Sequence, residues 1–505
     1  MNRRLLVNAL VSAAQVVVVG GAFFVLYRFL LDVLGAADFG VWALVLATTS
    51  ATAVANLGLA ASAVKFVSQY RARGDTVYVA QLIQTAMLSV GGVLAVVLPL
   101  LYPALRALLG VFIEPASKLP EALSILPYAL VSFWLTSVGG VALSCLDGFQ
   151  RVDWRGGLLM GSTLTYLGLA FLLVPDGGLI GLAQAQVIQA ALLFAAGWLL
   201  LRRLLPALPL VPWRWHRGAF REMLGYSLNF QVIAVFQMLF EPVTKALVSR
   251  FGGVDVLAYF EMAHRMVFQI RALFATAHQA IVPTIAEVQE TAPERLRDLY
   301  AGSFRLLLYL LVPALPFFIA LTPLISRVWI GRYEPAFVTF AVLLFAGWFL
   351  NLTSGPAYFA NMGTGALRWN VIGHAVAGVL NAALGVALGW YAGGTGVVVG
   401  FMTAIVAGSL TTTLAYHRAH GIRMAGLVEP ATLWLGAAGL AALGAALALY
   451  EWLRAAWPLA ALALAVVAVF ALVVALPLWR HPMRAVLQAW LARAFLRGRS
   501  APVRR

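Results

Sequence analysis

Apolar stretches of about twenty residues recur along the whole chain, separated by charged or glycine- and proline-rich breaks. A helix of about that length crosses the hydrocarbon core of a bilayer. An open strand would leave its backbone donors and acceptors unpaired in hydrocarbon, so helix is the only spanning state for these stretches. Because 62% of the 505 residues are apolar and 11% are charged, the sequence predicts an all-α integral membrane protein.

The breaks divide the chain into about fourteen predicted transmembrane helices. The basic start precedes a long apolar run without a small-residue cleavage site, which favours a retained first helix over a cleaved signal. The single cysteine, Cys145, excludes an internal disulfide and is predicted to be a packing residue. The predicted helices cover residues 7–31, 40–64, 80–102, 123–146, 156–175, 178–200, 223–249, 255–281, 304–326, 336–359, 370–391, 394–416, 432–450 and 457–478.

Lysine and arginine residues gather on one side of this topology. An even number of spans puts both termini on the same side, together with the basic loops around Arg71, Arg151 and Arg217. The positive-inside rule therefore predicts that both termini are cytoplasmic. The net charge of +16 then describes a cytoplasmic rim facing anionic membrane lipids, so no nucleic-acid partner is expected.

An internal repeat relates the first six predicted helices to the next six. The segment LGAADFGVWALVLA aligns with FGGVDVLAYFEMAH at an offset of 217 residues and pairs Gly35 with Gly252. The segment DGFQRVDWRGG aligns with NMGTGALRWNV and leads, at an offset of 215 residues, to a match of Gly181 with Gly396. Because each half has an even number of helices, the sequence predicts two six-helix lobes in a parallel repeat about the membrane normal.

The repeat sets the predicted domain borders. A proline-rich cytoplasmic linker joins the two lobes, and two extra C-terminal helices follow them. The basic tail has an apolar helical face that suits a helix lying on the inner leaflet, with a frayed tail as the alternative. The predicted domains are 1–203 for the N-lobe, 204–222 for the linker, 223–420 for the C-lobe, 421–479 for the last two helices and 480–505 for the tail.

The stretch LGAADFGVWALVLATTSATAVANLGLAASAVKFVSQYRARGD, from Leu34 to Asp75, resembles the start of bacterial polysaccharide or O-antigen flippases. Their superfamily also holds multidrug and toxic-compound extruders and the lipid II flippase. The resemblance implies a V-shaped two-lobe transporter with a central cavity in the bacterial inner membrane. It implies movement of an undecaprenyl-pyrophosphate-linked oligosaccharide from the cytoplasmic to the outer leaflet, with a polysaccharide polymerase and other export proteins as further partners.

Charged residues inside the predicted helices carry the site prediction. A charge at mid-bilayer depth is costly and normally faces a protein interior or a wet cavity. Lys245 lies 217 residues after Arg28, so both lobes would place a cation at an equivalent position near the outer end of their first helix. We predict one cationic site from this pair. The alternatives are snorkelling of Arg28 to the interface and an i,i+4 pair of Lys245 with Glu241.

A second group of ionisable residues lies on the eighth predicted helix. His264, Arg271 and His278 recur every seven residues and share one stripe of a helix. Glu261 and Arg265 form an i,i+4 couple beside this stripe. Arg271 has no acid at this spacing, and a guanidinium fork matches phosphate oxygens, so it is the first choice for a diphosphate contact.

The predicted substrate-binding residues are therefore Arg28, Lys245, Arg265 and Arg271. Static hydrogen bonding between helices is the alternative role for the polar residues around them. Pro242 lacks an amide donor and is the predicted hinge. The supporting polar residues of the cavity are Glu241, Glu261, His264, Gln237, Gln269 and Asn56.

Other classes of protein fit the sequence less well. A cation-coupled extruder would be expected to expose an unpaired carboxylate, whereas Glu241 and Glu261 each have a basic residue four positions later. An enzyme would need a sizeable polar loop, and no nucleotide-binding, metal-ligand or nucleophile motif is present, so no cofactor or metal is predicted. The sequence therefore favours a flippase, with an extruder or a lipid II-type flippase of the same superfamily as the alternative.

Overall fold

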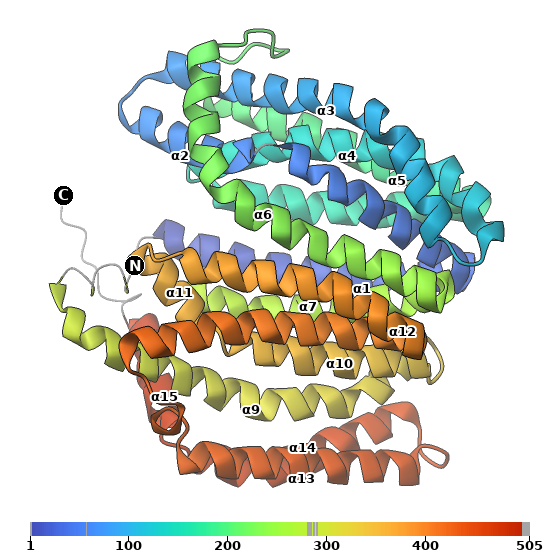
Figure 1. Ribbon diagram of the computed structural model, residues 1–505, viewed down its shortest axis with the longest axis vertical. Coiled ribbons are helices and arrows are strands. Elements are labelled where there is room, and N and C mark those ends of the chain that lie inside the picture. Colours follow the sequence, from blue (N-terminus) through green and yellow to red (C-terminus); the bar gives the residue numbers. More distant parts are fainter. Residues whose placement is uncertain (1–2, 57, 280–284, 286–287, 289–290, 497–505) are drawn as a thin grey trace. The chain divides into compact units, whose positions relative to one another are not determined.

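The computed structural model describes residues 3–56, 58–279, 285, 288 and 291–496, and this part of the chain is helical, with short turns between the helices (Figure 1). The helices are α1 (Arg3–Ser50), α2 (Leu59–Ala72), α3 (Thr76–Phe112), α4 (Leu119–Gly148), α5 (Val152–Leu204), α6 (Arg217–Gly252), α7 (Val254–Gln279), α9 (Leu296–Trp329), α10 (Pro335–Leu352), α11 (Gly355–Thr364), α12 (Arg368–His420), α13 (Pro430–Leu453), α14 (Leu459–Arg480) and α15 (Met483–Leu496).

Nine helical segments in the described part are long and apolar enough to cross a membrane. Three of them, Ala14–Ala53, Val152–Leu204 and Arg368–His420, each contain most or all of two predicted helices that meet at a non-helical break. The charged helices α6 and α7 match two further predicted spans. The all-α membrane fold class is confirmed. Cys145 is fully buried, as expected of a packing residue.

The internal repeat is visible in the backbone. The hairpin α5 and the hairpin α12 are both 53 residues long, and their bounds lie 216 positions apart in the sequence. Their breaks have nearly the same conformation, with φ/ψ of 52°/−136° at Gly178 and 59°/−145° at Gly393. The break at Gly35, 79°/171°, corresponds to 90°/161° at Gly253, one residue later than the predicted partner Gly252.

Two further glycines occupy equivalent positions in the two hairpins and have the same structural role in both. A Cβ atom on Gly181 would lie 2.0 Å from the carbonyl oxygen of Leu173, and one on Gly396 would lie 1.9 Å from that of Leu388. Both glycines follow the break of their hairpin, where the returning arm passes close to the backbone of the first arm. Only glycine allows this approach, which explains the predicted match of Gly181 with Gly396.

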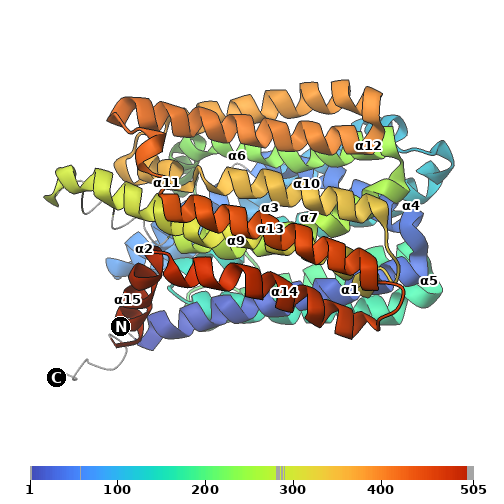
Figure 2. The same cartoon turned by 90° about the horizontal axis from the view of Figure 1, so that it is seen from below.

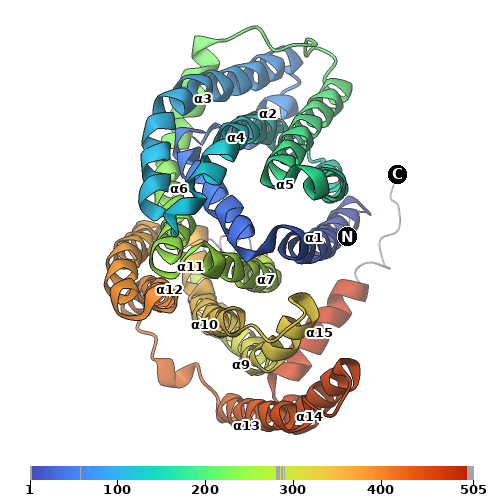
Figure 3. The same cartoon turned by 90° about the vertical axis from the view of Figure 1, so that its right-hand side faces the viewer.

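The described helices form two compact units. The first contains residues 2–261 and 386–397, and the second contains residues 262–385 and 398–505. In the first unit, α4 and α5 pack together and α1 packs on both (Figure 3). Helix α6 packs against α1, α2 and α3, so it belongs to this unit although the repeat assigns it to the C-lobe. The two units are defined by contacts within the structure, whereas the two lobes are defined by the sequence repeat. The predicted lobe borders stay a prediction.

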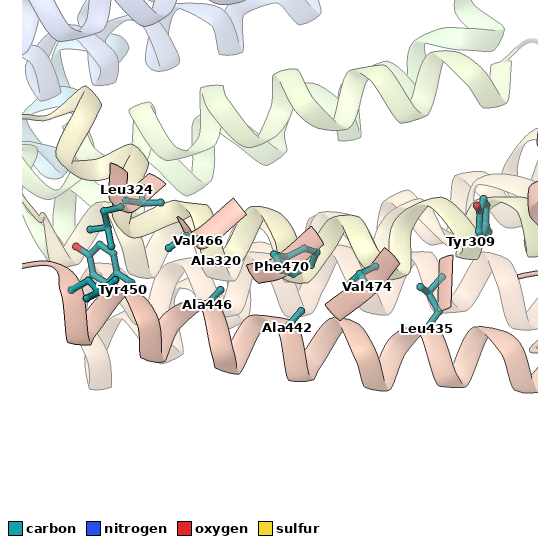
Figure 4. Close-up of a cluster of buried hydrophobic side chains, with 12 residues drawn as sticks. Tyr309, Ala320, Leu324, Leu435, Ala442, Ala446, Tyr450, Val466, Phe470 and Val474 are labelled. Atoms are coloured by element: carbon teal, nitrogen blue, oxygen red, sulfur yellow. The ribbon is translucent and has the colours of Figure 1, made fainter. Parts of the chain in front are cut away.

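The second unit has an apolar core where α13 and α14 pack on α9 (Figure 4). Along α13, Ala442 lies near Phe470 and Ala446 lies near Val466 of α14 in this core. Small residues on one helix let the aromatic ring of the other approach closely, which is a common way to pack helices in a membrane. The two C-terminal helices are therefore fastened to α9.

Helix α15 turns away from the end of α14 and contacts both α14 and α9 (Figure 2). Met483 and Leu487 pack against the core of α9, α13 and α14, whereas Val486 is exposed. Part of the apolar face predicted to lie on the inner leaflet is thus used for packing within the protein. The position of α15 on the membrane surface stays a prediction.

The segment between α5 and α6 is fixed to α3. The indole Nε1 of Trp215 donates to Ser89 Oγ at 2.9 Å, and the amide of His216 donates to Thr85 Oγ1 at 3.1 Å. Trp213 is 66% exposed. Helix α6 begins at Arg217, inside the predicted linker 204–222, so the extended connection is shorter than predicted.

The close approach at the repeated glycines predicts a similar loss of stability when either Gly181 or Gly396 is replaced by alanine. Gly181→Ala and Gly396→Ala should each lower the free energy of unfolding by about 1–3 kcal/mol, because a methyl group would overpack against a backbone carbonyl. The measurement is thermal unfolding of each purified variant in detergent.

Gly168→Ala is the matched control, because a Cβ atom on this glycine of α5 meets no atom within 4 Å. Wild-type stability of both test variants would contradict the close approach of the two arms.

Candidate functional site

Lys245 lies between two carboxylates in the first unit. Its Nζ atom is 2.6 Å from Glu241 Oε1, one turn earlier on α6, and 2.6 Å from Glu261 Oε2 on α7. The break at Gly253 turns the chain back, so positions about two turns from each side of it face one another. The side chains of Lys245 and Glu261 are 7% and 3% exposed. This is a buried ion pair between consecutive helices.

A tyrosine from the first helix completes this group. The hydroxyl of Tyr27 donates to Glu261 Oε1 at 2.8 Å, across 234 positions of sequence. The Tyr27 ring is fully buried and lies edge-on to Phe39 at 4.9 Å between ring centroids and to Trp42 at 6.2 Å. We call Tyr27, Glu241, Lys245 and Glu261 the Lys245 cluster. Its apolar surroundings strengthen the attraction between the charges and raise the cost of removing one.

The turn between α6 and α7 is held by a second set of contacts in the same unit. Arg250 NH1 is 3.0 Å from Glu114 Oε2, and the amide of Val254 donates to the Glu114 carbonyl at 2.9 Å. A Cβ atom on Gly40 would lie 1.8 Å from the carbonyl oxygen of Val254, so α1 also passes very close to this turn. These contacts join the start of the predicted C-lobe to α1 and to the connection after α3, both in the predicted N-lobe.

The start of α6 is fixed to the same unit. The hydroxyls of Tyr70 and Tyr78 donate to the two carboxylate oxygens of Glu222 at 2.9 and 2.8 Å. The hydrogen bond to Glu222 raises the pKa of Tyr70, because it stabilises the protonated phenol. The ammonium of Lys65 lies over the Tyr226 ring, 3.8 Å from its centroid. Both ends of α6 are therefore attached to the first unit.

Arg28 has a separate partner. Its Nε atom is 2.6 Å from Asp32 Oδ2, one turn further along α1, and its side chain is 37% exposed. Sequence reasoning did not consider Asp32, although it lies at the i,i+4 spacing used for other pairs. A common cavity for Arg28 and Lys245 stays a prediction.

Arg271 lies in the second unit on an aromatic surface. Its guanidinium carbon is 4.3 Å from the centroid of the Trp348 ring and 5.6 Å from that of Phe268. One terminal nitrogen donates to Asn351 Oδ1 at 3.4 Å, and Asn351 in turn donates to Ser409 Oγ at 2.7 Å. The guanidinium is thus oriented by rings on one side and by an amide on its edge.

The Arg271 guanidinium keeps capacity for a further ligand. Its Nε atom is buried and has no hydrogen-bond partner among the described residues. An arginine carries five N–H donors, and the long contact to Asn351 uses one of them. We call Arg271, Trp348, Asn351 and Ser409 the Arg271 cluster. It can present a planar, oriented cation to a group with several acceptor oxygens, such as a phosphate.

The other predicted residues of α7 lie close to this cluster in sequence but have different surroundings. His264 is buried and its ring stacks on Phe268 at 5.8 Å between centroids. Arg265 and Gln269 are half-buried in the same unit. His264 is therefore part of an aromatic core in this conformation, and a role for these three residues in lining a cavity stays a prediction.

The side chains of Gln237 and Asn56, like that of His278, lie outside the described residues. Pro242 lies within α6, which continues as one helix from Arg217 to Gly252. A hinge at Pro242 stays a prediction. Within the described part of the chain, no group of three or more His, Cys, Asp or Glu side chains could hold a metal ion.

The fold and these clusters define a polytopic helical membrane protein with ionisable groups inside its spans, which is an arrangement typical of transporters. The family model for polysaccharide biosynthesis proteins matches residues 25–333, more than half of the chain, and the chain belongs to this family. Comparison with curated protein sequences gives no match.

Solved structures with a similar fold include a flippase and a multidrug transporter. One is the lipid II flippase MurJ in an inward closed conformation, with a TM-score of 0.73 and 13% identity, covering 95% of this chain and 100% of the other. Another is a multidrug resistance MATE family transporter of the MOP superfamily in an inward-facing conformation. Its TM-score is 0.62 at 13% identity, and the match covers 81% of this chain and 94% of the other. At this identity the likeness shows a common fold.

The different burial of the residues in the Lys245 cluster predicts that they contribute unequally to the free energy of unfolding. Lys245→Ala should lower the free energy of unfolding by about 3 kcal/mol, because Glu261 would lose its lysine in a buried place. Glu241→Gln should cost under about 1 kcal/mol, because the Glu241 side chain is 47% exposed. Thermal unfolding of both purified variants in detergent measures the difference.

Equal stabilities of the two variants would contradict the buried position of the pair between Lys245 and Glu261. Lys118→Ala serves as a comparison, since its pair with Asp38 at 2.6 Å is only partly buried.

Proposed function

We propose that this chain is a flippase that moves an undecaprenyl-pyrophosphate-linked oligosaccharide from the cytoplasmic to the outer leaflet for polysaccharide export. The observation that carries the proposal is the Arg271 cluster, an oriented guanidinium with a buried donor, Nε, that has no hydrogen-bond partner among the described residues. A diphosphate offers several acceptor oxygens to such a donor set. Membership in the polysaccharide biosynthesis family supports a glycan as the rest of the substrate.

Arg271 would contact the diphosphate directly. The Trp348 ring covers one face of the guanidinium, so the in-plane N–H groups are the ones available to the ligand. Arg265, Gln269 and His264 lie on the same helix and would contribute further donors when the pathway opens. Arg28 and Lys245 would add positive charge along the same pathway. In this conformation Lys245 is held by two carboxylates, so its contact with substrate would require the Lys245 cluster to open.

The contacts around the turn between α6 and α7 suggest how the pathway is closed. The bond of Tyr27 to Glu261 and the pair of Glu114 with Arg250 join the two predicted lobes at the end of α6 that the positive-inside rule puts outside. Release of substrate to the outer leaflet would need these contacts to separate. They would therefore act as an outer gate, with Pro242 in α6 as its hinge.

Other activities receive less support. A lipid II-type flippase would use the same diphosphate chemistry, and the fold shared with the lipid II flippase keeps this alternative open. A cation-coupled extruder would need an acidic site, whereas Glu241 and Glu261 both contact Lys245. Transport involves no covalent step at the protein. It therefore accounts for both clusters, and no enzymatic reaction is needed. The proposed location is the bacterial inner membrane, with both termini cytoplasmic and export proteins such as a polysaccharide polymerase as neighbours.

Substitutions of Arg271 test the proposal through the geometry of the cation. Arg271→Lys should lower glycan export roughly tenfold, because an ammonium offers a point charge without the bidentate fork. Arg271→Glu should abolish export, because it places a negative charge against the diphosphate. Export is measured in cells that carry each variant as the only copy, at equal amounts of protein in the membrane.

Arg106→Glu is the control, since Arg106 is an exposed arginine on α3. Normal export from Arg271→Ala at a normal protein level would contradict the proposed substrate contact. Loss of protein from the membrane in every Arg271 variant would point to a packing role instead.

A further inference from the structure

A groove separates the two arms of the α5 hairpin in the first unit. Its volume is about 490 Å³, and most of its lining is apolar. Gly157 and Gly161 on the first arm are exposed, and a Cβ atom on either would meet no atom within 4 Å. Leu192 and Ala196 line the facing side on the second arm. The two glycines therefore leave the space that a larger side chain would fill.

The groove has the depth of one membrane leaflet. Its lining runs along the first arm from Asp153 to Thr165 and along the second from Leu200 back to Gln189. Twelve residues of helix rise about 18 Å, close to half of a hydrocarbon core about 30 Å thick. The groove thus begins at the end of α5 near its termini and stops near the middle of the bilayer.

The deep end of the groove is closed by polar groups that satisfy one another. Gln189 donates to the hydroxyl of Ser162, and the Thr165 hydroxyl donates to the Gly161 carbonyl at 2.9 Å. The bond between Gln189 and Ser162 connects the two arms, whereas the bond of Thr165 lies within the first arm, and neither draws a polar ligand to that depth. The space above them suits a hydrocarbon chain that enters from the leaflet.

Two arginines flank the mouth of the groove, and one of them, Arg151, neutralises the acid in its lining. Arg151 stacks on Trp154, with its guanidinium carbon 4.0 Å from the ring centroid, and binds Asp153 through two bonds of 3.1 and 3.0 Å. The acid that lines the mouth is therefore neutralised. Arg203 is exposed and lies three residues after Leu200, so it extends the lining of the second arm by one turn.

We infer that this groove binds one acyl chain of an anionic phospholipid, with the phosphate of the headgroup at Arg203. Basic pockets between transmembrane helices on the cytoplasmic side commonly hold anionic headgroups. The positive-inside rule assigns this mouth to the cytoplasmic leaflet. The site is independent of the proposed transport activity. A polyprenyl carrier is a poorer fit, because its chain is longer than one leaflet is deep.

The test compares lipid binding to the full-length protein by native mass spectrometry, with phosphatidylglycerol and phosphatidylcholine of identical acyl chains. Wild-type protein should bind phosphatidylglycerol more tightly. Gly161→Leu should weaken binding of both lipids by about tenfold, because the leucine side chain occupies the groove. Gly168→Leu is the matched control, because Gly168 is exposed on the same arm and lies outside the groove. This variant should bind both lipids as wild type does.

Arg203→Gln should remove the preference for phosphatidylglycerol and leave binding of phosphatidylcholine unchanged. Unaltered binding to Gly161→Leu would overturn the groove as the site. Equal binding of both lipids to wild type would overturn the headgroup contact. If a polyprenyl diphosphate at equal concentration displaces phosphatidylglycerol from wild type, the groove belongs to the transported lipid and the inference of a phospholipid is wrong. Should Gly161→Leu not fold, Gly157→Leu gives the same comparison.

Discussion

A lysine buried in a membrane-spanning helix has to be neutralised where it lies, and the contacts of Lys245 with Glu241 and Glu261 do this. The pair fixes the relative position of α6 and α7 on either side of the break at Gly253. Through Tyr27 it also connects α7 to α1. The part of the first unit around the turn between α6 and α7 therefore depends on one group of charges that is stable only while its members stay together.

The cations of the two clusters have different surroundings, and these suit different roles. In the Lys245 cluster the single cation has two carboxylates close by, which suits a structural connection that can open as a whole. In the Arg271 cluster the cation lies on an aromatic ring and has only a weak amide contact, which suits recognition of a ligand. The groove in α5 adds a site for a lipid that is not transported, so lipid binding and transport would use different parts of the chain.

The fold was largely predictable from the sequence, because hydrophobic length and the absence of water in a bilayer leave few choices. The repeat was predictable because Gly181 and Gly396 are required at close backbone approaches. The partners of the charges were harder to predict. Local spacing offers Arg265 to Glu261, whereas the structure brings Lys245 and Tyr27 to it from other helices. No local spacing signal could have predicted the contact of Arg271 with Asn351, which lies 80 positions away, or the stacking on Trp348.

In the proposed function, Arg271 recognises a lipid-linked diphosphate. Mass spectrometry of the lipids that copurify with wild type and with Arg271→Glu, at equal amounts of folded protein, tests it directly. We expect an undecaprenyl-pyrophosphate-linked oligosaccharide with wild type and its loss from the variant, while ordinary phospholipids remain with both. The same lipid-linked oligosaccharide in equal amounts with both proteins would contradict the claim.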